Sequence, residues 1–216
     1  VLCLFPASRC VRLTSLLIRV YAPLRPAIAA PLTAIQLLWL NLVTDSFPAL
    51  ALGREKGEPG IMKMPPRPKG EPIINKTMLT HVFIQAIAIF VCVATAFLTA
   101  ITSKSSFFFA EGIEPLTGAR TVAFATLILA ELFRAYASRS ERISVFKLGL
   151  FTNQLMNMAV GASLALLLAV IYIPGVNMIF DNVMLSATAW LVILPLALIP
   201  FTVSEVYKVI KSKAQK

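Results

Sequence analysis

Residues 31–52 read PLTAIQLLWLNLVTDSFPALAL, an apolar stretch that carries one carboxylate, Asp45. A bilayer core about 30 Å thick is crossed by roughly 20 apolar residues in a helix, so this stretch is long enough to span it. An aspartate near the centre of such a helix costs about 2.5–3.5 kcal/mol and therefore usually faces protein or an ion path instead of lipid. The stretch predicts a membrane helix that contains a polar site.

Three oxygen-bearing side chains share one face of this predicted helix. Asn41, Thr44 and Asp45 stand at positions i, i+3 and i+4, which a helix brings to one side. Pro48, one turn further along that face, has no amide hydrogen and loosens the helical ladder, which frees backbone carbonyls as additional ligands. Because oxygen ligands suit hard cations, we predict a cation site at these residues.

The whole chain has the composition of a membrane protein. Apolar residues make up 58% of its 216 residues, and its mean hydropathy is +0.81, well above that of an ordinary soluble domain. The sequence predicts an all-α, polytopic bundle that is integral to the membrane, with about five transmembrane helices. These helices are expected at approximately residues 31–52, 77–101, 119–138, 148–173 and 184–207.

The net charge of +10 follows the connections between spans and does not indicate a nucleic-acid partner. By the positive-inside rule, the basic segments after the first span, after the third span and at the C-terminus face the cytoplasm, and this alternation supports all the spans together. Membrane lipids with anionic headgroups are the partners we expect for this charge. The basic residues of these three segments are Arg54, Lys56, Lys63, Arg67, Lys69, Lys76, Arg139, Arg142, Lys147, Lys208, Lys211, Lys213 and Lys216.

Residues 1–30 form a separate, arginine-rich segment that contains three prolines and no acidic residue. Within it, residues 11–21 have the pattern of a short amphipathic helix on the membrane surface, and a distorted or degenerate span explains the same residues. A targeting sequence is a third interpretation of the composition. The predicted organisation is therefore an atypical segment at residues 1–30 and a transmembrane domain at residues 31–216.

A second carboxylate, Glu131, lies within the third predicted span. Both Glu131 and Asp45 stand about a dozen residues from the outer ends of their spans, so we expect them at similar depths in the membrane. Glu131 is therefore a candidate ligand of the same cation site. Arg134 supports a second interpretation, in which it forms a structural i, i+3 ion pair with Glu131 or extends toward the membrane surface.

Other residue types that carry chemistry form no recognisable site in the sequence. The single histidine and the three cysteines have no metal-ligand spacing, and no Walker motif or catalytic triad pattern is present. Phe107, Phe108 and Phe109 are expected to form an aromatic anchor at the outer membrane interface. The sequence therefore gives no candidate for a catalytic or cofactor-binding residue in this chain.

Three stretches resemble the C-terminal membrane region of type IIA P-type ATPases, the family of the sarcoplasmic-reticulum calcium pumps and their bacterial relatives. They are PLTAIQLLWLNLVTDSFPALALG, IMKMPPRPKGEPIIN and LILAELFRAYASRSE. The resemblance covers roughly residues 31–216 and implies the sixth to tenth membrane helices of that fold. It also implies that Asn41, Thr44 and Asp45 match the sixth-helix cation ligands and that Glu131 matches the eighth-helix carboxylate.

The resemblance also implies a transported ion and partners. Sodium and proton pumps usually carry a different sixth-helix motif, so NLVTD implies calcium, with manganese or a similar divalent cation left open. ATP and magnesium would act only in the intact pump, because the family's motifs DKTGT, TGE and PEGL are absent from this sequence. The expected partner is then the missing N-terminal part of the pump, and the isolated chain is expected not to hydrolyse ATP.

The origin of the chain has two interpretations. Residues 1–30 stand where the family has its fifth helix, yet they lack the Asn and Glu of that helix, as a truncated, mis-spliced or frame-shifted fragment would. The alternative hypothesis is a catalytically inactive membrane protein that binds or regulates an intact pump or another membrane partner.

The alternation of basic residues predicts the topology of the chain. Residues 53–76, the segment around Arg139 and the C-terminal tail should face the cytoplasm, whereas residues 103–118 and 174–182 should face outward. Single cysteines introduced at Ser105 and Lys213 in a cysteine-free background should therefore react with an impermeant reagent from opposite sides of the membrane. Labelling of both positions from one side would refute the arrangement of spans.

Overall fold

The computed structural model describes residues 31–55, 76–103, 105–140, 143–149 and 151–214, and the structure of these residues is helical with no named strand. Residues 1–30, with their predicted surface helix or degenerate span, lie outside the described residues. The elements are five long helices, α2 (Ala34–Gly53), α3 (Lys76–Thr102), α5 (Pro115–Ala137), α7 (Gln154–Tyr172) and α9 (Ala187–Ala214), and three short ones, α4 (Ser105–Phe108), α6 (Val145–Leu148) and α8 (Val176–Ile179).

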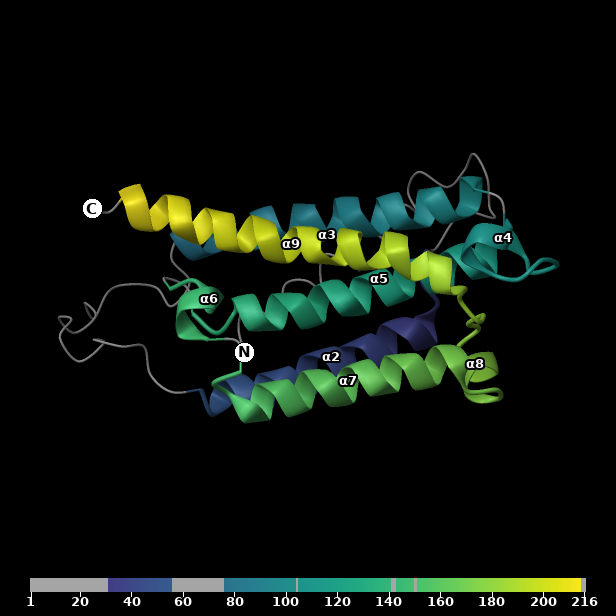
Figure 1. The fold of residues 1–216 in the computed structure, drawn as a ribbon, viewed down its shortest axis with the longest axis horizontal. Helices are drawn as coiled ribbons and strands as arrows, with labels where there is room; N and C mark the ends of the chain where they lie inside the picture. The colour runs from purple at the N-terminus through teal and green to yellow at the C-terminus, as the bar shows by residue number, and fades with distance from the viewer. Residues whose placement is uncertain (1–30, 56–75, 104, 141–142, 150, 215–216) are drawn as a thin grey trace.

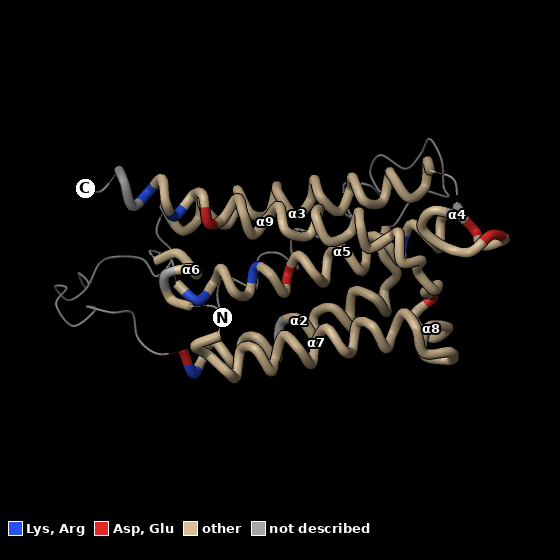
Figure 2. Tube along the Cα trace, viewed as in Figure 1, with Lys and Arg blue, Asp and Glu red and all other residues tan. Residues whose placement is uncertain are grey.

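The five long helices are each long and apolar enough to cross a membrane, which confirms the predicted all-α, multi-pass arrangement. Figure 1 shows them side by side along one common direction, with α4 and α8 at one end of the bundle and α6 near the other. Charged residues gather mostly at the two ends, and basic residues dominate the end where α6 and the C-terminus of α9 lie (Figure 2). We refer to this end as the basic end.

The largest displacements of predicted helix starts are at α5 and α7. The structure begins α5 at Pro115, before the expected residue 119, because a proline is well suited to the first turn of a helix. It begins α7 at Gln154, after the expected residue 148, because α6 ends at Leu148 and is followed by Gly149, whose φ of 83° does not continue a helix. Asn153 then caps the new helix by accepting a hydrogen bond from the amide of Met156 at 3.0 Å.

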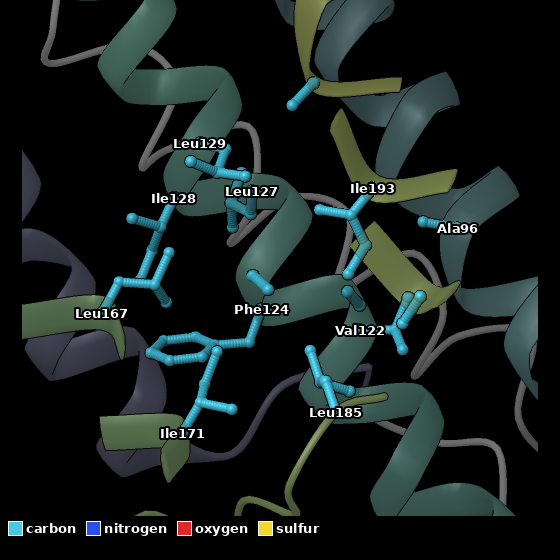
Figure 3. Packing of buried hydrophobic residues seen from close by; sticks show 14 of the residues in the cluster. Ala96, Val122, Phe124, Leu127, Ile128, Leu129, Leu167, Ile171, Leu185 and Ile193 are labelled. Atoms are coloured by element: carbon cyan, nitrogen blue, oxygen red, sulfur yellow. The ribbon is translucent and has the colours of Figure 1, made fainter. Parts of the chain in front are cut away.

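Helix α5 is the centre of the bundle, because it contacts α2, α3, α7 and α9. In Figure 3 the ring of Phe124 on α5 lies beside Leu167 and Ile171 of α7, and these residues belong to one continuous apolar core. Small side chains let the other helices approach α5 closely, as is common where helices pack within a bilayer. The alanines buried along α5 are Ala119, Ala123, Ala125, Ala130, Ala135 and Ala137.

The start of α2 is held at the end of the bundle opposite the basic end. Thr33 and Gln36 form a reciprocal capping box, in which the Gln36 amide donates to Thr33 Oγ1 at 3.4 Å and the Thr33 amide donates to Gln36 Oε1 at 2.9 Å. The Gln36 side chain also donates to Asn182 Oδ1 at 2.7 Å. This bond fixes the first turn of α2 to the segment between α8 and α9.

The prediction of an aromatic anchor was wrong for two of its three phenylalanines. Phe107 is partly exposed, whereas Phe108 and Phe109 are 2% and 1% exposed and pack into the core. Residues 108 and 109 turn inward because their segment pairs with the segment before α9, where Ser186 donates its amide to the Phe108 carbonyl at 2.9 Å. A short antiparallel bridge joins Phe109 to Leu185 in the same place.

The contact between Phe109 and Gly118 gives a test of this packing. A Cβ at Gly118 would lie 2.2 Å from Cε1 of the Phe109 ring, so Gly118→Ala should force the ring out of its place and cost about 1–3 kcal/mol of stability. Gly161→Ala on α7 is the matched control, since a Cβ there meets nothing within 4 Å. Thermal unfolding of the two purified variants in detergent should show a loss only for Gly118→Ala, and equal unfolding temperatures would contradict the packing.

Candidate cation site

Helix α2 is one continuous helix that includes Pro48, and it carries the predicted ligands Asn41, Thr44 and Asp45. Thr44 is 1% exposed, and its hydroxyl donates to the carbonyl of Leu40 at 2.5 Å. Asn41 is half-buried. The backbone of Asp45 lies in α2, and its side chain lies outside the described part of the structure. Because Pro48 has no amide hydrogen, the carbonyl of Thr44 lacks its usual helical donor.

Glu131 lies in α5 and is paired within its own helix. Its Oε2 atom accepts hydrogen bonds from Nη2 of Arg134 at 2.6 Å and from Nε at 3.0 Å, and the two side chains are 2% and 3% exposed. The structural i, i+3 pair that the sequence allowed is therefore present. The role of Glu131 as a cation ligand stays a prediction, in which a bound cation would share this carboxylate with Arg134.

The structure brings the helices of the predicted ligands together. Helices α2 and α5 are in contact, and α7 contacts both of them. Figure 2 shows charge within the length of α5, while most other charge lies at the ends of the bundle. Among the described side chains, which do not include that of Asp45, no group of three or more His, Cys, Asp or Glu gathers around a point.

Sequence reasoning missed a polar junction at the basic end that joins three of these helices. Arg139, just beyond α5, donates through Nη2 to Oε1 of Glu55 at 2.8 Å and through Nε to Oε2 at 3.1 Å. Asn153, at the start of α7, donates to the same Oε2 at 2.5 Å. We call Glu55, Arg139 and Asn153 the three-helix junction. The sequence indicated Arg139 only as part of a basic segment, because Glu55 is distant from it along the chain.

The electrostatics of the three-helix junction favour an ionised Glu55, which lies beyond the span of α2. Burial alone would raise the pKa of Glu55, but hydrogen bonds from Arg139 and Asn153 and the positive charge of Arg139 outweigh it, so that the pKa is lowered from its ordinary value of 4.5. The ionised Glu55 therefore stabilises the fold at neutral pH, and this stabilisation is lost as the pH falls through the lowered pKa of Glu55 in the folded chain.

A second polar cluster at the basic end joins α9 to the ends of α5 and α6. Lys208 is 2% exposed, and its ammonium donates to the Ala137 carbonyl at 2.6 Å and to Glu205 Oε1 at 2.8 Å. Glu205 Oε2 accepts from the hydroxyl of Ser144 at 2.6 Å and from the amide of Val145 at 3.1 Å. Lys208 was predicted as part of the C-terminal tail, and the structure instead places it inside α9.

Comparison with known proteins identifies close sequence relationships. Residues 29–210 match the family model described as "Cation transporting ATPase, C-terminus". The chain is 36% identical over 174 residues to the "Calcium-transporting ATPase" of Bacillus subtilis (strain 168). The aligned residues make up 81% of this chain and 18% of that protein. The chain is also 32% identical over 179 residues to "Calcium-transporting ATPase type 2C member 2" of Mus musculus. This alignment covers 83% of this chain and 18% of the mouse protein. The chain thus spans about a fifth of the length of these relatives.

The buried pair on α5 gives a test that is independent of any cation. Arg134→Met leaves the Glu131 carboxylate without its partner and should destabilise the chain by about 3–5 kcal/mol. The double variant Glu131→Gln with Arg134→Met removes both charges and should recover most of that loss. Unfolding of the single and double variants in detergent measures the interaction free energy between Glu131 and Arg134. If the changes in unfolding free energy of the two single substitutions simply added in the double variant, the pair would not stabilise the bundle.

Proposed function

We propose, since this chain belongs to the family of cation-transporting ATPase C-terminal regions, that it forms the membrane-spanning transport portion of an ATP-driven calcium pump. The observation that carries the proposal is the polar motif within the otherwise apolar helix α2, which contacts α5, the helix that carries the buried charged pair. The similarity to calcium-transporting ATPases supports calcium as the transported ion.

The proposed ligands on this chain are Asn41, Thr44, Asp45 and Glu131. A hydroxyl that donates one hydrogen bond keeps lone pairs to accept another contact, so Thr44 can donate to Leu40 and still present its oxygen to a cation. The Thr44 carbonyl, which Pro48 cannot engage, is an additional oxygen in the same turn. Calcium takes 6–8 oxygen ligands, so the remaining ligands would come from other membrane helices of the pump.

Arg134 gives this site a fixed counter-charge. When no cation is bound, the guanidinium compensates the charge of Glu131, so only the charge of Asp45 needs another compensation. When a cation is bound, Glu131 would be shared between the cation and Arg134, which weakens its contribution relative to that of Asp45. We therefore propose Asp45 as the principal charged ligand and Glu131 as a secondary one.

The rest of the transport cycle would depend on parts of the pump that carry motifs not found in this sequence. ATP and magnesium would act there, at a phosphorylated aspartate, and the cytoplasmic domains would transmit the resulting motion to the membrane helices. The partners proposed for this chain are therefore those domains, the transported divalent cation and the surrounding membrane lipids.

A chimaeric pump tests the proposed function. Residues 31–216 would replace the matching region of the Bacillus subtilis calcium-transporting ATPase, because the two sequences are 36% identical over their aligned residues. Asp45→Asn keeps the shape of the side chain but removes its charge, and should abolish or severely weaken calcium-activated phosphorylation from ATP. Glu131→Gln should weaken it less, because Arg134 already shares that carboxylate. Ser46→Ala, at the exposed neighbour of Asp45, is the matched control and should leave the calcium dependence unchanged.

The measurement is radiolabelled phosphoenzyme formed at graded calcium concentrations. Phosphorylation from inorganic phosphate without calcium shows, in every variant, whether the cytoplasmic domains are intact. If Asp45→Asn left the half-saturating calcium concentration unchanged, Asp45 would not be a ligand and the proposed site would be wrong.

A further inference from the structure

Pro48 interrupts the hydrogen-bond ladder of helix α2 and divides the helix into a part before it and a part after it. The missing amide hydrogen removes one bond from the helical ladder, and proline is a common cause of bending in helices. The part before Pro48 holds Asn41 and Thr44, whereas the part after it ends at Gly53 and leads to Glu55. Any ligand geometry on the first part therefore depends on how both parts are held against their neighbours.

Helix α7 holds each part of α2 by a hydrogen bond to a backbone carbonyl. Before Pro48, the buried hydroxyl of Ser163 donates to the carbonyl of Val43 at 3.3 Å. After Pro48, Asn153 Nδ2 donates to the carbonyl of Ala51, also at 3.3 Å. These contacts lie on the two sides of the proline, so α7 supports α2 across the position where its own ladder is interrupted.

The three-helix junction then fixes the position of α2 along its axis relative to α5. Besides binding Glu55 in a bidentate manner, Arg139 donates through Nη1 to the Gly149 carbonyl and through Nη2 to Thr152 Oγ1, both at 2.8 Å. Its side chain is 1% exposed. A guanidinium can make these bonds together because its donors lie in a rigid planar fork, which a lysine ammonium does not have.

This arrangement has a direct consequence for a cation site shared between α2 and α5. One residue of axial displacement moves a helix by about 1.5 Å, whereas metal–ligand distances tolerate only about 0.2 Å. Arg139 follows α5, which carries Glu131, and Glu55 follows α2, which carries Asn41 and Thr44. The ion pair therefore joins the two helices that carry the proposed ligands.

We propose that Arg139 and Ser163 are positioning residues of the cation site, which set the register of α2 against α5 and α7 without touching the cation. This inference rests on the proposed function for its cation, and on the contacts of the described residues for its geometry. The lowered pKa of Glu55 is consistent with it, because the carboxylate is then charged throughout the neutral range.

The first experiment measures calcium dependence in the chimaeric pump. Arg139→Lys and Ser163→Ala should each raise the half-saturating calcium concentration for phosphorylation from ATP, by about tenfold for Arg139→Lys, as is typical when support for metal ligands is removed. Phosphorylation of these variants from inorganic phosphate without calcium should stay near the level of the unmodified chimaera. A general loss of structure would lower this phosphorylation as well. Arg54→Lys, at an exposed arginine near Glu55, is the matched control and should have no effect.

A double substitution shows whether Arg139 acts through Glu55. If it does, Glu55→Gln combined with Arg139→Lys should raise the half-saturating calcium concentration no more than the larger single effect. The proposal would be overturned if the double variant raised the half-saturating calcium concentration by the product of the two single factors. An unchanged calcium dependence in Arg139→Lys would overturn it as well.

The second experiment separates this inference from the proposed function, because it needs no calcium. In the full 216-residue chain, spin labels at exposed positions 50 on α2 and 158 on α7 report the distance between these helices after Pro48, and labels at positions 42 and 158 report it before Pro48. Arg139→Lys should broaden or shift the first distance, and Ser163→Ala the second. Unchanged distances in the 216-residue chain would refute the positioning role. Changed distances in that chain, together with a chimaera that shows no calcium-activated phosphorylation, would refute the proposed function alone.

Discussion

The absence of water from the hydrocarbon of a bilayer is the constraint on which the rest of this structure depends. A polar group in that medium needs a partner within the protein, since an unsatisfied group costs several kcal/mol. Helix α5 meets this constraint by its central position, because four other long helices surround it and separate Glu131 and Arg134 from lipid. The small side chains of α5 are what allow those helices to come close enough to do so.

The same constraint explains where the polar side chains of the spans are directed. Thr44 and Thr126 each donate to the carbonyl four residues earlier in their own helix, and Ser163 donates to a carbonyl of α2. These hydroxyls are satisfied by backbone atoms and so need no other polar side chain nearby. Larger polar networks occur instead at the basic end, where Arg139 and Lys208 lie near the ends of the spans.

The sequence predicted what depends on local pattern and missed what depends on distant contacts. Long apolar runs predicted the five spans, and the spacing of Glu131 and Arg134 allowed the ion pair that the structure contains. The junction of Arg139 with Glu55 was not predicted, because 84 residues separate these side chains and only the packing of α2 beside α5 brings them together. Phe109 was misplaced for the same reason, since its pairing with Leu185 is invisible in either segment alone. The ligand role of Asp45 stays a prediction, because its side chain lies outside the described residues.

The position of Glu131 and Arg134 on one helix also bears on how the chain is assembled. Synthesis proceeds from the N-terminus, so α5 enters the membrane before α7 and α9 exist to surround it. A pair whose partners lie on different helices would leave two bare charges in the bilayer during that interval. A pair formed within a single turn exists as soon as the helix forms, so the two side chains enter the bilayer as an ion pair with no net charge. The later helices then enclose a charge that has already been compensated.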